Sequence, residues 1–565
     1  MLLNTLYFAA LTAAAACPKP PDWSAQKWDA IVVGAGTAGI IVADRLSESG
    51  LKTLLLEQGG ASYGITGGDE RPAWLDDTKL SRVDVPGLYS TIFASSNSSL
   101  LCKPEVVDGF QGCTLGGNSA INAGLYFQPP ASDWDDYHPE GWHSADVQPA
   151  VDKLLERQPA VTNYSSDGKT YAEDIHDSVK DWIVNDAGYA DVSFSDEPNK
   201  KEKVFGKPVY NYIDGQRGGP VRTYLQTALT RRNFHLSTGV TVKHVEQEQG
   251  KASAVAVELA NGDTKSIQLS EKGRVVLSAG ALLSPKILMY SGIGPNDTLS
   301  KLANSSHTPY TDKSSWIEQS EVGEGLFDNP NTFISLSSPS VNSYVYEYDD
   351  PIPEDRDLYL NDRSGPYSFA SQTGAFWTYI DNEDGSRSGV QGTVSNTGYA
   401  DHMGNNTITV NIYGTSGLKS SGRVTLSDDG KFIAGPSKGI YYSDTRDAKA
   451  IATFIHSLFQ HLPDSTPDSP AQEGLTPLNL AQNSTVDEIQ KYITTPSKYA
   501  VGAVNHWSSS CRIGKCVDTD TKVIGTENIH VVDASIIAPM TVNPQFAVMV
   551  AGEMGAAKII GLSNA

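Results

Sequence analysis

The stretch WDAIVVGAGTAG, residues 28–39, decides the fold predicted for this 565-residue chain. An apolar run typical of a buried strand leads directly into three glycines with the spacing of a dinucleotide-binding turn. We expect a helix from Ile40 to Ser49 and a second strand at Thr53–Leu56, with Glu57 at its end. Such a strand–turn–helix–strand unit with a terminal acid predicts an α/β protein with a Rossmann-like nucleotide-binding sheet.

Each glycine of this turn has a predicted role. Gly34 allows the tight turn, Gly36 allows a pyrophosphate to approach the backbone, and Gly39 allows the helix to pack closely on the strand. The free N–H groups of Thr37 and Ala38, at the start of the helix, would bind the phosphates. We therefore expect all five residues to belong to a cofactor site.

Glu57 limits the choice of dinucleotide. It follows the turn at the spacing at which an acid accepts a hydrogen bond from the adenosine ribose. An acid at this position disfavours a 2′-phosphate, so NADP is not expected. This motif alone leaves FAD and NAD as alternatives.

A second glycine-rich segment, GCTLGGNSAINAGLY at residues 112–126, favours FAD. Small residues at this density allow the backbone to lie against a flat ring, and Asn118, Ser119 and Asn122 add polar side chains. A surface loop is the alternative, but large apolar residues recur through the segment and predict that it is buried.

A third segment, GALLSPKILMYSGIG at residues 280–294, follows an apolar run at 274–279 that predicts a buried strand. We expect Ser284 to cap a helix that begins at Pro285 and stops at Ser291–Gly292. An ordinary strand-to-helix turn is the alternative. A small-residue crossing followed by a capped helix suits a site where a cofactor approaches the backbone.

The reacting residues are expected near the C-terminus. His506 is suited to accept a proton, because a neutral imidazole titrates near working pH. A predicted strand at Ile529–Val532 ends in Asp533, which would hold a cofactor hydroxyl or orient backbone N–H groups near the pyrophosphate. Asn543 is expected to cap the final helix, with Pro544 as its first residue.

Segments 112–126 and 280–294 resemble the two signatures of the glucose–methanol–choline (GMC) family of flavin oxidoreductases. In the first signature, Asn118 stands where the family usually has Gly, Ser or Thr. The resemblance implies a Rossmann-like FAD-binding domain and an α+β substrate domain with a largely antiparallel sheet. We expect the FAD to be non-covalent, because no His-containing attachment motif is evident.

The pair His506 and Asn543 resembles the His/Asn active-site pair of the same family. The resemblance implies that hydride leaves the donor carbon for flavin N5 while His506 accepts the hydroxyl proton and Asn543 hydrogen-bonds the same oxygen. The helix after Asn543 would direct its positive end at the flavin pyrimidine. The residues expected at the cofactor are Gly34, Gly36, Thr37, Ala38, Gly39, Glu57, Thr114, Gly116, Asn118, Ser119, Asn122, Ala123, Gly124, Leu125, Val242, Ala279, Asp533, Ala534, Pro544 and Gln545.

Within the family, pieces such as PEGWHS (139–144), GPVRTYLQTAL (219–229) and NHW (505–507) resemble the flavin domain of fungal cellobiose dehydrogenase. That resemblance implies oxidation of a sugar or oligosaccharide at its C1 hydroxyl to a lactone. An aryl or alkyl alcohol oxidase is one alternative. A flavin hydroxynitrile lyase on the same fold is another, because a fold does not determine the reaction.

Four residues are expected to contact the substrate. Ser395 replaces an Arg that holds the distal sugar in the cellobiose enzyme, and Val504 replaces a Ser of the pocket. Glu173 is matched loosely to an acidic sugar-binding residue, and Asn505 precedes the reacting histidine. A changed distal subsite is therefore expected.

The three cofactor segments must converge, so the FAD-binding domain is expected to be discontinuous. We assign it to residues 24–128, 214–310 and 500–565, and the substrate domain to residues 129–213 and 311–499.

Elements of the substrate domain are predicted from their patterning. Thr407–Tyr413 and Gly422–Leu426 read as antiparallel strands over the flavin, and a helix at Asp447–Leu462 would cover one face of that sheet.

Features outside the motifs indicate a secreted protein. Residues 1–16 predict a signal peptide cleaved near Ala16. Four later cysteines allow three pairings, of which the local pairs Cys102–Cys113 and Cys511–Cys516 are the simplest in an oxidising compartment, and their spacing does not predict a metal site. Six N-glycosylation sequons begin at Asn97, Asn163, Asn296, Asn304, Asn405 and Asn483.

The net charge of −23 argues against nucleic acid and anionic membranes as partners. No stretch after the signal peptide is expected to span a bilayer, so we expect a soluble monomer. The first strand is expected to begin near Asp29, so we expect no preceding haem domain. Electrons are therefore expected to pass to a diffusible quinone or to a separate protein.

Overall fold

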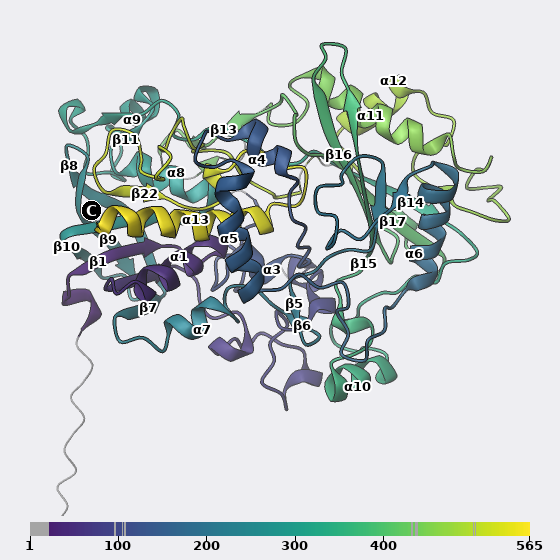
Figure 1. Ribbon diagram of the computed structural model, residues 1–565, viewed down its shortest axis with the longest axis horizontal. Helices are drawn as coiled ribbons and strands as arrows, with labels where there is room; N and C mark the ends of the chain where they lie inside the picture. Colours follow the sequence, from purple (N-terminus) through teal and green to yellow (C-terminus); the bar gives the residue numbers. More distant parts are fainter. Residues whose placement is uncertain are drawn as a thin grey trace, which may run out of the picture.

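Two seven-stranded sheets lie side by side in the computed structural model of the chain (Figure 1). The structure describes residues 22–94, 98–103, 106, 109–430, 433–434, 439–500, 502 and 504–564. The predicted signal peptide at 1–16 lies outside the described residues, as does Asn97 of the first sequon.

The first sheet contains the predicted nucleotide-binding unit. Its order is β7-β2-β1-β10-β9-β8, and β22 pairs with β10. Strands β7, β2, β1, β10 and β22 are parallel to one another, whereas β8, β9 and the first half of β10 pair antiparallel. The strands are β1 Trp28–Val33, β2 Thr53–Glu57, β7 Phe234–Thr238, β8 Val240–Glu248, β9 Lys251–Leu259, β10 Thr264–Leu277 and β22 Ile529–Val531.

Helices around the first sheet bury its apolar strands. Helix α1 packs on α7 and α13, and α13 also packs on α5 (Figure 1). The helices of this half are α1 Thr37–Glu48, α3 Asn118–Ile121, α4 Ala131–Tyr137, α5 Ser144–Arg157, α7 Tyr224–Ala228, α8 Gly280–Tyr290, α9 Asn296–Leu302 and α13 Gln545–Asn564. Helix α1 begins three residues earlier than expected, directly after Gly36.

Helix α8 differs from the prediction at its start. It begins at Gly280 rather than Pro285, so Ser284 and Pro285 lie inside it. Pro285 has no N–H for the carbonyl of Ala281, and the hydroxyl of Ser510 donates to that carbonyl instead, at 2.5 Å. Ser284 therefore does not cap the helix.

Helix α13 also corrects two predictions. It begins at Gln545, and the Pro544 carbonyl accepts the first helical hydrogen bond, so Pro544 precedes the helix rather than opening it. Contrary to expectation, the described part of the chain contains one helix, Gln545–Ser563, long and apolar enough to cross a membrane. Most of it is buried inside the protein, which accounts for its apolar composition.

The second sheet has the order β21-β14-β17-β16-β15-β4-β3, and only its β3–β4 pair is parallel. Helix α11 packs on β15, β16 and β17, α6 packs on β15, and α12 packs on α11. The elements are β3 Ala190–Asp191, β4 Val204–Gly206, β14 Asn331–Ser337, β15 Gln372–Asp381, β16 Arg387–Ser395, β17 Thr407–Gly414, β21 Thr476–Pro477, α6 Glu173–Lys180, α11 Thr445–Phe459 and α12 Val486–Thr494.

Residues 422–426 do not join this sheet, contrary to prediction. They form two short strands, β18 Gly422–Arg423 and β19 Thr425–Leu426, which pair with β13 Glu324–Leu326 and β20 Ile433–Ala434. These partners lie outside the seven-stranded sheet, so the segment is taken up by local pairing instead. The other short elements are β5 Tyr212–Ile213, β6 Gln216–Arg217, β11 Ile293–Gly294, β12 Ile317–Glu318, α2 Thr91–Ala94 and α10 Pro353–Asp362.

Alternation along the second sheet gives it two different faces. Ile334, Val394 and Val410 face the apolar core that contains α11. Phe333, Asn411 and Thr393 lie in register on β14, β17 and β16, and they face the other way.

Both predicted disulfides, Cys102–Cys113 and Cys511–Cys516, are present.

A contrast between two glycines tests this packing. A Cβ at Gly39 would lie 2.0 Å from the Gly34 carbonyl oxygen, whereas a Cβ at Gly561 would have no atom within 4 Å. Gly39→Ala should lower the Tm by about 5 °C, because backbone must shift to accommodate the methyl group. Gly561→Ala should leave the Tm unchanged or raise it, since alanine favours a helix. Thermal unfolding by circular dichroism checks both, and equal Tm values for the two variants would contradict this packing.

Candidate active site

A cavity of about 700 Å³ opens between the two sheets. The turn after β1, the end of β2, β8 and the start of α8 line it from the first sheet. The second sheet contributes the face that bears Phe333, Thr393 and Asn411. Residues 504–507 and 543–545 complete the wall.

Most of the predicted site residues line this cavity. They are Gly34, Gly36, Thr37, Ala38, Glu57, Asn118, Ser119, Asn122, Ala123, Leu125, Val242, Ala279, Val504, Asn505, His506, Asp533, Ala534, Asn543, Pro544 and Gln545. Four other predicted cofactor residues, Gly39, Thr114, Gly116 and Gly124, do not line it and instead shape the loops around it.

The turn after β1 and the second glycine-rich segment are joined directly. Gly116 donates its N–H to the carbonyl of Ala35 at 2.8 Å. Gly34 has a φ of +100°, and a Cβ there would lie 2.5 Å from the Ser278 carbonyl oxygen, so only glycine fits. Gly36 caps α1 without a side-chain hydrogen bond, so the helix N-terminus keeps free N–H groups at the cavity, as an anion site requires.

Glu57 anchors the same turn. Its two carboxylate oxygens accept the N–H groups of Ala35 at 2.8 Å and Gly59 at 2.9 Å. Burial raises the pKa of Glu57 to about 7, although these hydrogen bonds oppose the shift. Glu57 also lines the cavity, and its carboxylate keeps acceptor capacity beyond these two hydrogen bonds.

Asp533 orients backbone groups, which is one of the two predicted roles. It accepts hydrogen bonds from Gly280 N–H at 2.9 Å and from the Ser284 hydroxyl at 2.6 Å, and thereby holds the first turn of α8. Its other oxygen accepts from Ser535 N–H at 2.8 Å. Burial raises the pKa of Asp533.

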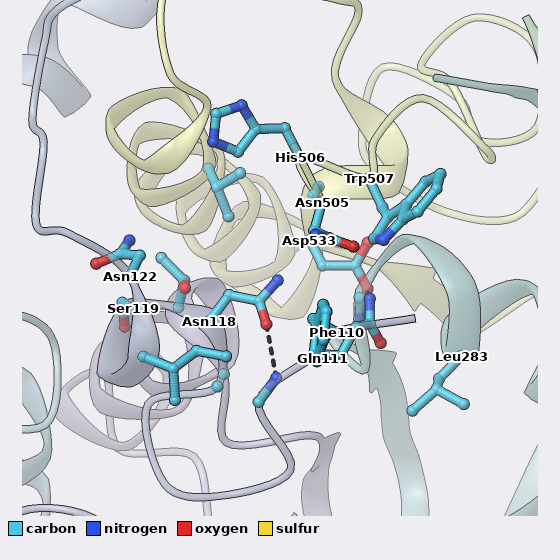
Figure 2. A pocket seen from close by; sticks show the side chains of 18 of the residues that line it. Phe110, Gln111, Asn118, Ser119, Asn122, Leu283, Asn505, His506, Trp507 and Asp533 are labelled. Carbon is cyan, nitrogen blue, oxygen red and sulfur yellow. Dashed lines mark hydrogen bonds between the residues drawn. The ribbon is translucent and has the colours of Figure 1, made fainter. Parts of the chain in front are cut away.

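Asn118 is exposed at the cavity and is fixed by one hydrogen bond. Its Oδ1 accepts the N–H of Gly112 at 2.8 Å, which leaves the amide nitrogen directed at the cavity (Figure 2). Ser119 follows on the short helix α3, and Asn122 is the extended residue directly after it (Figure 2).

His506 is held by a buried carboxylate that the sequence did not single out. Asp328 accepts the backbone N–H of His506 at 2.6 Å and those of Val504 and Asn505 at 3.1 Å each. Tyr441 donates its hydroxyl to the same carboxylate at 2.7 Å. Burial raises the pKa of Asp328 to about 6.

The imidazole of His506 has a defined tautomer. Its Nδ1 lies 2.9 Å from Oδ1 of Asn329, an acceptor, so Nδ1 carries the hydrogen and Nε2 keeps a free lone pair. Burial lowers the pKa of His506 to about 4. The ring lines the cavity as a neutral base (Figure 2).

Tyr413 connects the two predicted reacting residues. Its ring meets that of His506 edge-on, with 6.2 Å between ring centroids. Its hydroxyl accepts a hydrogen bond from Nδ2 of Asn543 at 3.2 Å, and Gln391 donates to Oδ1 of Asn543 at 2.9 Å. His506 and Asn543 thus both contact Tyr413, and all three residues line the cavity.

Two predicted substrate residues lie outside the cavity. Ser395 is on the same face of β16 as Thr393 but at the strand's end, 3.4 Å from the hydroxyl of Ser371. Glu173 is half-exposed and pairs with Lys207 at 2.8 Å. Their predicted contacts with substrate stay predictions.

The cavity has a charged end and a neutral end. Its charged lining residues, Glu57, Lys243, Lys286 and Asp533, all belong to the first sheet or the segments that adjoin it. Among the described residues, those that the second sheet contributes carry no charge, and Asn331 there has a buried Oδ1 without a hydrogen-bond partner. Phe333 stacks on Tyr399 at the same wall, with 4.3 Å between ring centroids.

The residues present fit FAD. Two buried donors that line the cavity, Nε1 of Trp507 and Nε2 of Gln545, have no hydrogen-bond partner, as expected where a ligand supplies the acceptors. The free N-terminus of α1 fits a pyrophosphate, and the cavity volume lies in the upper part of the range for small-molecule sites.

Comparisons with known proteins agree with this geometry. Residues 28–331 and 419–552 match the N- and C-terminal models of the family described as GMC oxidoreductase. The chain is 27% identical to the chloroplastic fatty acid photodecarboxylase of Chlamydomonas reinhardtii, over 91% of this chain and 87% of that one. It is 30% identical to an oxygen-dependent choline dehydrogenase of Vibrio vulnificus, over about half of each chain (49%).

A solved structure of formate oxidase has the same fold. It superposes with a TM-score of 0.74 at 18% identity and covers 95% of this chain and 99% of its own.

Proposed function

The chain belongs to the GMC oxidoreductase family and is an FAD-dependent enzyme that acts on CH–OH donors, and we propose that its donor is a neutral sugar oxidised at the C1 hydroxyl to a lactone. The observation that carries the proposal is that His506 and Asn543 both contact Tyr413 and line the cavity together with an uncharged wall. Bound FAD supplies the hydride acceptor, N5.

His506 is the proposed base for the hydroxyl proton. Its Nε2 is free because Nδ1–H is directed at Asn329. Asn543 has a second amide hydrogen besides the one given to Tyr413, and that hydrogen is available to the oxygen of the reacting hydroxyl. The base takes the proton as the C–H bond gives up its hydride, so the donor loses two electrons and two hydrogens.

The neutral wall supports a sugar as donor. Asn331, Asn411 and Thr393 offer amide and hydroxyl groups, and the stacked rings of Phe333 and Tyr399 provide an apolar surface for a ring face. Those same aromatic rings favour a second candidate, an aryl alcohol. A charged donor such as choline would meet no countercharge among the described residues of this wall.

We further propose that FAD is held without a covalent bond. Among the described lining residues His506 is the only histidine, and none is a cysteine.

We also propose that the protein is secreted. Two disulfides support this, as do four exposed sequon asparagines, Asn163, Asn304, Asn405 and Asn483. A monomer that passes electrons to a quinone or a protein acceptor completes the proposal.

Replacing the base tests its role. His506→Ala should reduce the rate of flavin reduction by the donor about 10²–10⁴-fold, the range for a lost general base, while the folded variant keeps its FAD. Acid precipitation of the protein should release that FAD, as expected for a cofactor without a covalent bond. Anaerobic stopped-flow absorbance gives this rate. Reduction at nearly the wild-type rate would remove His506 from the mechanism.

The pH dependence follows from two pKa values. Lowering the pH protonates Asp328 first, near its raised pKa of about 6, and His506 later, near its lowered pKa of about 4. The reduction rate should therefore be constant from pH 8 to about 6.5, fall slightly near 6 as the loop loosens, and fall steeply near 4. A steep fall near pH 6.5, as for an unperturbed histidine, would contradict this.

Asp328→Asn should abolish the slight fall of the reduction rate near pH 6. It should also lower the flavin reduction rate by about 10²-fold, because the loop that carries His506 loses acceptors for its N–H groups. Tyr441→Phe is the matched control. It removes one hydrogen bond to the same carboxylate, leaves the three backbone bonds, and should have a much smaller effect.

A panel of donors tests the substrate class. Neutral mono- and disaccharides should bleach the flavin anaerobically, whereas choline and formate should not. Asn331→Leu should raise the KM for sugars about tenfold and change that for an aryl alcohol less, since one hydrogen bond is lost. Bleaching by aryl alcohols alone would favour the second candidate, and no bleaching by any neutral alcohol would refute both.

A further inference from the structure

Arg217 is a fully buried charge without a carboxylate partner. Its side chain is 1% exposed, and no Asp or Glu of the described chain lies within ion-pair distance. Arg82 and Arg222, by contrast, pair with Glu70 and Asp84. An unpaired buried charge is costly, so its presence calls for a compensating group that the protein itself does not supply.

The hydrogen bonds of Arg217 lead toward the cavity. Nε donates to the Val83 carbonyl at 3.0 Å, Nη1 donates to Oδ1 of Asn122 at 3.0 Å and lies 3.4 Å from the Ser119 carbonyl, and Nη2 has no partner. Ser119 and Asn122 both line the cavity (Figure 2).

Asn122 passes the polarisation on to Gln545. Its Nδ2 donates to Oε1 of Gln545, while its Oδ1 also accepts the N–H of Gly124 at 2.9 Å. Gln545 is 7% exposed and lines the cavity, and its Nε2 is buried without a hydrogen-bond partner. Gln545 is also the first residue of α13, whose N-terminus carries partial positive charge.

We propose that Arg217, Asn122 and Gln545 form a polarised hydrogen-bond chain that stabilises the negative charge brought to the flavin by hydride transfer. A hydride adds one net negative charge to its acceptor. A guanidinium that donates to Asn122 strengthens the next donor in the chain, and the last donor is the buried, unpartnered Nε2 of Gln545, a residue that lines the cavity. Arg217 is thus a positioning residue that sets the electron affinity of the site from outside the cavity, and this role rests on the proposed flavin chemistry.

Arg217→Met tests the charge with a side chain of similar length. The midpoint potential of the bound FAD should fall, and the affinity for sulfite, which adds to N5 and leaves negative charge on the ring, should fall at least tenfold. A tenfold change corresponds to about 30 mV for a two-electron couple. Arg217→Lys should recover part of both values.

Two further variants control the result. Arg274→Met removes a half-buried arginine that also lacks a carboxylate partner among the described residues. Arg274 hydrogen-bonds Leu562 near the opposite end of α13, so the change should leave both values unchanged. Gln545→Leu removes the terminal donor and should reproduce the effect of Arg217→Met, which keeps the test intact if Arg217→Met does not fold.

An unchanged potential and sulfite affinity in folded, flavin-loaded Arg217→Met or Gln545→Leu would overturn the inference. These readouts need only bound FAD and no donor, so they are separate from the test of the sugar. If sugars do not bleach the flavin of FAD-loaded wild-type protein, the proposed substrate is refuted. The potential and the sulfite affinity of the variants would still decide whether the hydrogen-bond chain of Arg217, Asn122 and Gln545 acts as proposed.

Discussion

The carboxylate of Asp328 is the interaction on which the reacting end of the cavity depends. It lies just before β14 of the second sheet and accepts three successive N–H groups from residues 504–506, near the C-terminus. These bonds hold Asn505 in a left-handed conformation, φ +66°, and place His506 beside Asn329. Because the neighbouring Asn329 orients the imidazole, one short segment determines both the position and the tautomer of the base.

One end of the cavity is charged and the other is neutral, and each end suits a different ligand. The first sheet presents backbone N–H groups, buried acids and a helix N-terminus, which suit a dinucleotide. The second sheet presents amides, hydroxyls and aromatic rings without charge, which suit a neutral donor. Burial lowers the pKa of His506 to about 4, so its imidazole stays neutral in mildly acidic surroundings, as the proposed base requires.

The sequence predicted β1, β2, the end of β10 and β22 of the first sheet, because apolar runs and glycine spacing are local signals, but it did not predict β7, β8 or β9. It did not predict where α8 begins, since the bond from Ser510 that replaces the missing N–H of Pro285 comes from a residue more than 200 positions away. Asp328, Tyr413 and Arg217 were missed for the same reason: each acts through a contact distant in sequence, and none stands in a distinctive motif. The sequence also predicted the strand at 407–413, but only the tertiary structure shows which of its two faces lines the cavity beside His506.

We propose that a neutral sugar gives up the hydride at its C1 to bound FAD, while His506 accepts the hydroxyl proton and Asn543 hydrogen-bonds the hydroxyl oxygen. The most direct measurement is anaerobic stopped-flow reduction of the bound flavin by a sugar carrying deuterium at C1. The account predicts bleaching with a primary isotope effect on the reduction rate in the wild type. A flavin that no neutral sugar reduces, or that is reduced without a primary isotope effect under conditions where reduction limits the rate, would contradict it.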